Sequence, residues 1–244
     1  MIKKAFLDKQ AIKAQNERRT PNFLRRLCFT VVENVLRQHY SDSYSMRCLQ
    51  ASLAIASILK KVGIRSQAYT GEVCVSQVFL DNKIAPSWNG FWGDDHHVWL
   101  TTEFGELIDL TIKYLHLHPA TKGNKQLEIP AIWWSDASRW PNIIKYLPQG
   151  PTAVKLPNEE MIDLEVFQIK VDQELSQFMK SNSVQQVVFS PVLYGPESMN
   201  DLYSQGNPWV VKSAVLQSSV LPYPQRVIER ERELLASYKR KTNR

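Results

Sequence analysis

The chain has 244 residues, of which 43% are hydrophobic and 22% charged, a balance typical of globular rather than disordered proteins. The formal net charge is +6, but lysine and arginine concentrate at the two ends, a pattern more typical of solvated faces than of nucleic-acid binding. The chain has no run of about 18 apolar residues and no apolar core of a secretion signal near Met1, so we expect a soluble, cytoplasmic protein that does not span a membrane.

The chain contains three cysteines, Cys28, Cys48 and Cys74, which are widely spaced and form no CxxC pair. An odd number without such pairs argues against a disulfide framework and against a cysteine zinc site. We therefore expect free thiols and no metal or cofactor. Cys28 lies on the apolar stripe of a helix and Cys74 within a strand, so both are interpreted as buried packing residues.

The first two expected elements are helices. Residues 2–19 form a charge-rich helical pattern with one loose apolar face. Thr20 is then expected to cap a second helix, with Pro21 at its first position and apolar residues at three- and four-residue intervals to about His39.

The stretch from Ser45 to Gly63 predicts a third helix that is buried on most sides. Between Met46 and Val62 it consists mainly of apolar, small or helix-favouring residues. Ser45 is the expected N-cap, and Gly63 the expected residue after the last turn. Cys48 then lies in the first turn, where unpaired backbone N–H groups and the positive end of the helix dipole favour a thiolate.

Strands follow this helix. Residues 65–80 predict one or two strands, 81–83 a turn, and 88–95 a loop with large aromatics. Residues 96–102 and 106–112 predict two strands joined by the three-residue turn 103–105, with Gly105 in the left-handed conformation.

The second half of the chain gives weaker signals. Aromatic packing is expected around 132–135 and 139–142, a linker or long loop at 148–151 and 157, a helix at 158–181, a short strand at 187–189 followed by loops, and a charged helix at 224–241. We therefore divide the chain into a core at 1–150, with its N-terminal helices, and an extension at 151–244, which is either a separate unit or an integral part of a single domain.

The length of the turn in the predicted hairpin determines whether His97, a candidate base, can contact Asp109, a candidate orienting group. If the turn has three residues, Thr102 pairs with Glu106, and paired residue numbers add up to 208. His97 and Asp109 then point to the same side of the hairpin, within diagonal reach of each other. A two-residue turn would place them on opposite faces. A cysteine nucleophile needs such a base and orienting group, together with donors for the oxyanion.

These residues carry a resemblance. The order is a cysteine opening a helix that ends in Gly63-Ile-Arg65, strand residues ending in Gly71, then His97-Val-Trp-Leu and Leu107-Ile-Asp-Leu-Thr111. It resembles the transglutaminase-like branch of the papain-like cysteine enzymes over about residues 40 to 115. The resemblance implies an α+β fold in which a cysteine-bearing helix packs on an antiparallel sheet that carries the histidine and aspartate.

The resemblance also implies a catalytic triad of Cys48 as nucleophile, His97 as general base and Asp109 as the group that orients it. The implied chemistry is hydrolysis or acyl transfer at an amide or ester bond through a thioester, of the peptidase, deamidase or transglutaminase type. Its substrate is a protein, a peptide or a small amide. The papain branch has an oxyanion-hole glutamine six residues before the nucleophile, where this chain has Asp42. The expected donors are therefore the Cys48 N–H and Tyr44.

Several alternatives stay open at this point. Trp88, Trp92 and Trp99 either line a substrate groove or cover the sheet. His96 would replace His97 after a one-residue shift, and Asp94-Asp-His-His97 is a weaker candidate for a metal site. His116 and His118 are expected on one face of an extended segment.

Two functional alternatives accompany the enzyme hypothesis. The first is a catalytically inactive fold that binds a peptide or a protein. The second is a basic protein that associates with nucleic acid.

Overall fold

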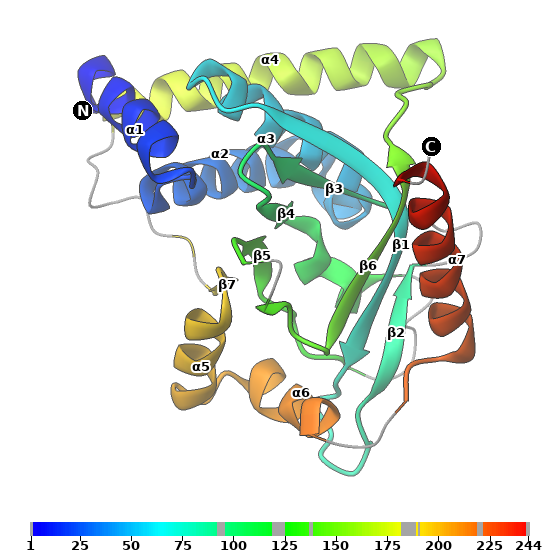
Figure 1. Ribbon diagram of the computed structural model, residues 1–244. Helices are drawn as coiled ribbons and strands as arrows, with labels where there is room; N and C mark the ends of the chain where they lie inside the picture. Colours follow the sequence, from blue (N-terminus) through cyan, green and yellow to red (C-terminus); the bar gives the residue numbers. More distant parts are fainter. Residues whose placement is uncertain are drawn as a thin grey trace.

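The structure is a computed structural model that describes residues 2–91, 96–118, 125–136, 139–181, 189, 191–218 and 222–242. It is an α+β fold in which helices cover both faces of a curled sheet (Figure 1). Trp92, Asp94, Asp95 and the first two residues of the predicted strand 187–189 lie outside the described residues.

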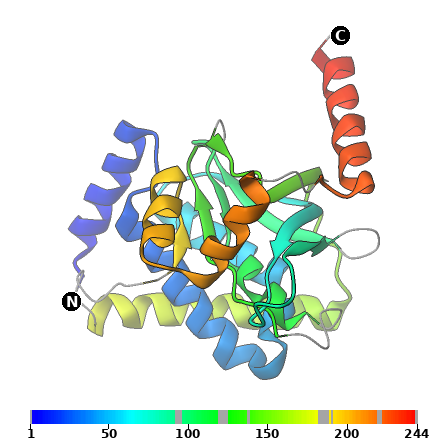
Figure 2. The ribbon, with the colours of Figure 1, turned by 90° about the horizontal axis from the view of Figure 1, so that it is seen from below.

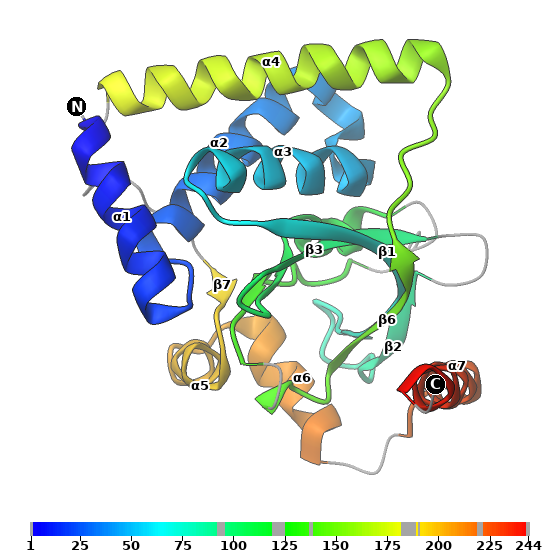
Figure 3. The ribbon, with the colours of Figure 1, turned by 45° about the horizontal axis from the view of Figure 1, so that its top comes forward.

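The N-terminal half supplies three α-helices and a short 3₁₀ helix. They are α1 (Lys4–Glu17), α2 (Asn22–Tyr40), the 3₁₀ helix η1 (Ser41–Met46) and α3 (Cys48–Lys61). Helices α2 and α3 lie between the sheet and the long helix α4 (Asn158–Ser181), as Figure 3 shows. The cysteine-bearing helix is therefore covered on two sides, as its composition predicts.

The sheet has seven strands: β1 (Ser66–Gln77), β2 (Ser87–Phe91), β3 (His97–Thr102), β4 (Leu107–Asp109), β5 (Ala131–Trp134), β6 (Ile144–Pro151) and β7 (Val192–Leu193). Their order is β2-β1-β3-β4-β5-β7, and β6 also pairs with β1. Because β6 pairs with residues of β1 that also pair with β3 or β2, it runs along one edge of β1 while β3 and β2 share the other. The β5–β7 pair is parallel, so the sheet is mixed and not wholly antiparallel as expected.

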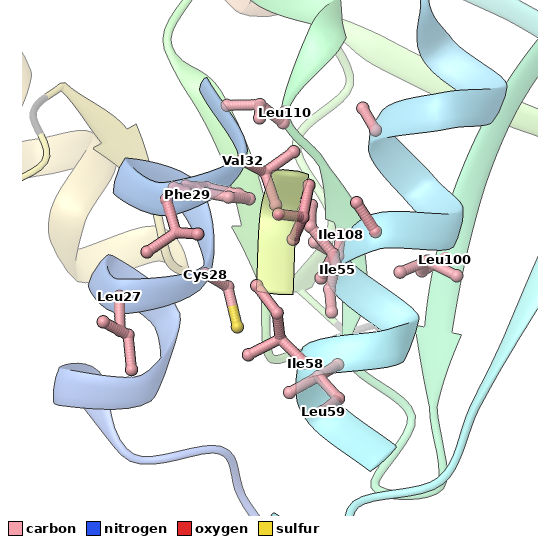
Figure 4. Close-up of a cluster of buried hydrophobic side chains, with 14 of the residues drawn as sticks. Leu27, Cys28, Phe29, Val32, Ile55, Ile58, Leu59, Leu100, Ile108 and Leu110 are labelled. Atoms are coloured by element: carbon pink, nitrogen blue, oxygen red, sulfur yellow. The ribbon is translucent and has the colours of Figure 1, made fainter. Parts of the chain in front are cut away.

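One hydrophobic cluster joins the helices to the sheet. Ile55 and Ile58 of α3 contribute to it with Leu100 of β3 and Ile108 of β4, and each is at most 1% exposed. Figure 4 shows the Cys28 side chain of α2 within this cluster, facing α3. Burying a large aliphatic side chain stabilises the fold by about 1.5–3 kcal/mol, so this cluster fixes α3 against β3 and β4. The packing interpretation of Cys28 agrees with its complete burial.

The opposite face of the sheet is covered by the C-terminal region. Trp209 of α6 (Pro208–Ser218) is buried among sheet residues such as Val75 and Trp134, after the short helix α5 (Pro196–Ser204). Helix α7 (Gln225–Thr242) projects from the rest of the molecule (Figure 2) and contributes Val227 to a third, small cluster. Side chains beyond residue 151 thus contribute to all three hydrophobic clusters. The predicted boundary between core and extension at residue 150 falls within β6. The division into two parts stays a prediction.

Several predicted elements are confirmed, among them the helices at 158–181 and 224–241, the long strand after Gly63, and the turn at 81–83. Others are wrong. The loop predicted at 88–95 begins with β2, and the linker predicted at 148–151 is part of β6, because both segments pair with β1. The loops predicted after residue 189 contain α5 and α6.

Three predictions about element ends are also wrong. Ser45 lies in η1, and Arg47 precedes the first residue of α3. Thr20 does not cap α2, because its N–H and hydroxyl donate to Glu106. The strand predicted at 106–112 ends at Asp109, and the 3₁₀ helix η2 (Thr111–Leu117) follows. His116 therefore lies in a helical turn and not in an extended segment with His118.

Within the described ranges, no helix is both long and apolar enough to cross a membrane.

Gly71 marks the closest approach of β6 to β1. A Cβ atom at this position would lie 2.3 Å from the Leu147 carbonyl oxygen and 2.8 Å from the Trp99 ring. The register between β1 and β6 shifts at this point.

We expect Gly71→Ala to lower the free energy of unfolding by about 1–3 kcal/mol, because the added methyl group forces two strands apart. Urea denaturation of both proteins measures this loss. Gly150→Ala is the matched control, since nothing lies within 4 Å of a Cβ there. Equal stability of the Gly71 variant and the wild type would contradict the prediction.

Candidate active site

Cys48 is the first residue of α3, and its side chain is partly exposed. The start of the helix is fixed to the sheet because the Ser52 hydroxyl donates to the Val98 carbonyl oxygen at 3.2 Å. Val98 follows His97 on β3. The packing of α3 on β3 therefore brings the cysteine to the strand end that carries the histidine.

The β3–β4 hairpin has the predicted register. Leu100 pairs with Ile108 and Thr101 with Leu107, and the Thr102 N–H donates to the Glu106 carbonyl at 2.9 Å. Gly105 has the left-handed φ of 81° that the three-residue turn requires. His97 and Asp109 consequently point to the same side.

His97 and Asp109 form a buried pair. Each is 2% exposed, and the His97 Nε2 lies 2.6 Å from the Asp109 Oδ2. Because a carboxylate only accepts, Nε2 carries the proton, and Nδ1 remains for Cys48. The other carboxylate oxygen, Oδ1, accepts from the Thr111 N–H and hydroxyl at 3.0 and 3.2 Å and from the Ile112 N–H at 3.0 Å. The first turn of η2 thus fixes the aspartate.

The Cys48 side chain lies close enough to the His97 ring to influence its pKa. Burial by itself lowers the pKa of His97, but the Asp109 carboxylate and, after it, Cys48 outweigh this effect and raise the pKa to about 10. The Phe91 ring stacks on the imidazole, with centroids 4.7 Å apart and an angle of 11°. The three side chains of the predicted triad therefore form a continuous chain of contacts.

Burial raises the pKa of the Cys28 thiol, and it raises that of Cys74 to about 12. Both cysteines lie in the core, whereas Cys48 is partly exposed. Among the three cysteines, Cys48 alone combines access from solvent with an imidazole partner, which is what a nucleophile requires.

The other predicted site residues that the structure describes pack against aromatic neighbours. Trp99 is 2% exposed and packs against Tyr146 on the sheet, whereas Trp88 packs at a tilt against Tyr223 near α7. The Tyr44 ring packs edge-on against Tyr114 at 4.9 Å. Of the two open interpretations of the tryptophans, Trp88 and Trp99 fit that of covering the sheet, and Trp92 lies outside the described residues.

The metal alternative at residues 94–97 stays a prediction, because Asp94 and Asp95 lie outside the described residues. Asp42 is exposed in η1, and His96 is exposed just before β3. Where the structure describes the chain, no group of three or more His, Cys, Asp or Glu side chains is suited to hold a metal ion.

Sequence reasoning missed two residues that contact the pair. Phe91 belongs to β2, which was expected to be a loop, and Tyr146 to β6, just before the predicted linker. The Tyr146 hydroxyl donates to the Asp109 Oδ2 at 2.8 Å. The sequence around Phe91 and Tyr146 does not indicate either contact, because both residues reach the His97–Asp109 pair through the pairing of β2 and β6 with β1.

Comparison of this chain with family models, with curated proteins and with solved structures finds no match.

The raised pKa of His97 predicts a pH dependence of stability. A histidine whose pKa is higher in the folded than in the unfolded chain, where it is about 6.5, contributes stability that is fully present below pH 6.5. This contribution is lost as the pH rises through the folded value of about 10.

We therefore expect the difference in unfolding free energy between the wild type and His97→Asn to shrink steadily from pH 6 to pH 10. Urea denaturation across this range measures it. A difference that grows with pH would contradict the assignment of His97 as the protonated partner of Asp109.

Proposed function

We propose that the protein is a cysteine-dependent hydrolase or acyltransferase that cleaves an amide or ester bond through a thioester on Cys48. The observation that carries the proposal is the chain of contacts from Cys48 through His97 to Asp109. The cysteine opens a helix and is partly exposed, and the histidine and aspartate are buried.

The first half of the reaction forms the thioester. His97 has already taken the Cys48 proton on Nδ1, in line with its raised pKa, so the sulfur attacks the substrate carbonyl carbon as a thiolate and a tetrahedral oxyanion forms. The carbon–nitrogen or carbon–oxygen bond then breaks, and the imidazolium gives its proton to the leaving group. Asp109 keeps the Nε2 proton in place throughout and so holds the ring in the tautomer that can act as base.

In the second half, His97 takes a proton from the acceptor, which attacks the thioester carbon and releases the cysteine. Water gives hydrolysis or deamidation, and an amine gives transamidation. The backbone N–H of Cys48 belongs to the first helical turn, whose N–H groups lack helical partners, and is the proposed oxyanion donor. Tyr44 stays a proposed second donor, although its ring packs against Tyr114.

The proposal includes the transglutaminase-like arrangement of the core. Its support is the order of cysteine, histidine and aspartate on helix, strand and neighbouring strand. We further propose a cytoplasmic location, because none of the three cysteines is in a disulfide and a reducing compartment preserves free thiols. The proposed substrate is a protein, a peptide or a small amide.

Alkylation by iodoacetamide at pH 6 tests the activated cysteine without knowledge of the substrate. We expect Cys48 to be modified at least tenfold faster than Cys28 and Cys74, with the sites identified by peptide mass spectrometry. His97→Ala should remove this advantage. If Cys48 reacts no faster than the two buried cysteines in the native protein, the proposed nucleophile is wrong.

Acylation by p-nitrophenyl acetate then separates an enzyme from a binding module. The enzyme releases a burst of p-nitrophenolate and carries a hydroxylamine-sensitive acetyl group on Cys48. Cys48→Ala abolishes both, and the matched control Cys74→Ser retains both. A rapidly alkylated Cys48 that no activated ester acylates would instead favour the catalytically inactive, peptide-binding alternative.

A further inference from the structure

Tyr146 contacts the candidate site from a strand that the triad does not use. Its hydroxyl donates to the Asp109 Oδ2 at 2.8 Å, and this is the oxygen that His97 Nε2 also contacts, at 2.6 Å. The two donors therefore share one carboxylate oxygen. The hydrogen bonds from Thr111 and Ile112, in contrast, all go to Oδ1.

The position of Tyr146 is fixed by its surroundings. It pairs with Val73 of β1, and its ring packs against Trp99 and Trp140 with centroids 5.0 and 5.5 Å away. Gly71, two residues before Val73 on β1, allows β6 to approach β1 closely. The hydroxyl is thus held in place by the sheet and not by a mobile loop.

Burial and the neighbouring Asp109 raise the pKa of Tyr146 well above its usual value. The phenol consequently keeps its proton throughout the pH range in which proteins fold, and it always acts as a donor to Asp109. It forms a hydrogen bond to a charged acceptor, which is stronger than one between neutral groups.

This arrangement bears on a specific difficulty of the proposed reaction. An imidazole that Asp109 holds too firmly in its protonated form makes a poor base and a poor proton donor, since catalysis requires the proton to leave. A second donor on the same oxygen takes up part of the negative charge that attracts the imidazolium.

We propose that Tyr146 is a positioning residue of this site, which fixes the Asp109 carboxylate and weakens its hold on the His97 proton. The inference rests on the proposed function for its role in turnover. Among the described residues, the titratable groups that face the pair are Cys48 from α3, Tyr146 from β6 and, beyond the Phe91 ring, His118 after η2.

The test follows the His97 ring by ¹H–¹⁵N NMR over a pH titration, in a Cys48→Ala background that removes the thiol from the equilibrium. Adding Tyr146→Phe keeps the ring packing and removes the hydroxyl. We expect His97 to titrate about 0.5 to 1 pH unit higher in this variant, as the loss of one hydrogen bond implies. The Nε2 proton signal should shift as well.

Tyr114→Phe in the same background is the matched control. Tyr114 is a buried tyrosine whose hydroxyl donates to a different carboxylate, Glu33, at 2.6 Å. It should leave the titration of His97 unchanged. Incorporating 3-fluorotyrosine at position 146 keeps the hydroxyl and makes it a stronger donor, so His97 should titrate lower, and this variant serves if Tyr146→Phe fails to fold.

An unchanged titration in both Tyr146 variants would overturn the inference, because a purely structural tyrosine would not affect the His97 proton. The proposed function fails differently. If the titration shifts as expected but p-nitrophenyl acetate never acylates Cys48, then Tyr146 tunes His97 in a protein that is not an acyl-transfer enzyme.

Discussion

Replacing Asp109 with asparagine is expected to slow the acylation of Cys48 by about 10³- to 10⁴-fold while the protein stays folded. The measurement is the rate of p-nitrophenolate release from p-nitrophenyl acetate, with circular dichroism as the check on folding. The variant replaces one carboxylate oxygen of a side chain that is 2% exposed with an NH₂ group of similar size, so it removes little packing.

The reason is the tautomer of His97. The asparagine oxygen can still accept from Thr111 and Ile112, which leaves the amide NH₂ facing the His97 Nε2. Nε2 must then accept, so the ring proton moves to Nδ1, the nitrogen that faces Cys48. The imidazole can no longer take the thiol proton, and the Tyr146 hydroxyl loses its carboxylate acceptor.

Asp163→Asn is the matched control. Asp163 of α4 lies 2.9 Å from the His39 ring of α2, a similar contact between residues that do not belong to the triad. It should leave acylation unchanged. If the two variants slow the reaction equally, Asp109 has no special role at the site.

Arg25→Met is expected to lower the free energy of unfolding by about 3–5 kcal/mol, because it leaves a buried carboxylate without its counter-charge. Arg25 and Glu106 are each 1% exposed, and Nη2 of Arg25 lies 3.2 Å from the Glu106 Oε1. Burial lowers the pKa of Arg25 to about 10, partly offset by Glu106, so the guanidinium is charged at neutral pH. Urea denaturation at pH 7 measures the loss.

The hairpin contains its own control for this prediction. Arg65 pairs with Glu103 at 2.9 Å, but its side chain is 87% exposed. Arg65→Met should therefore cost no more than about 1 kcal/mol. The double variant Arg25→Met/Glu106→Leu should recover part of the stability lost in Arg25→Met, since no unpaired charge is then buried. Equal losses at the buried and the exposed pair would contradict the argument.

The same ion pair ties the N-terminal segment to the hairpin of the candidate site. Thr20 donates to both carboxylate oxygens of Glu106, and the Thr102 hydroxyl donates at 3.1 Å. Glu106 thus fixes the turn whose length determines that His97 and Asp109 face the same way. We expect Arg25→Met to lower the alkylation rate of Cys48 as well.

The sequence predicts what depends on local chemistry. Gly105 requires a left-handed turn, and alternation along the two strands then places His97 and Asp109 on one side, which the observed register confirms. The helix that begins near Cys48 follows from its composition. The catalytic roles of these residues stay predictions.

The missed features depend on long-range contacts. Pro148-Gln-Gly-Pro151 contains the residues typical of a loop, yet β1 pairs with this segment and makes it a strand. Ser45 fits the composition of an N-cap, but η1 extends through it. The contact of Tyr146 with Asp109 depends on the pairing of β6 with β1, and no spacing in the sequence indicates it.

Strand β1 is paired along both edges, and its two edges are completed at different times during synthesis. Strands β2 and β3 follow β1 closely in the chain, whereas β6 follows only after β5. On a ribosome, Cys48, His97 and Asp109 all emerge before the strand that carries Tyr146. A nascent chain at that stage has one open edge on β1 and lacks the Tyr146 hydroxyl, so we expect the contacts of Asp109 to be complete only after β6 has been made.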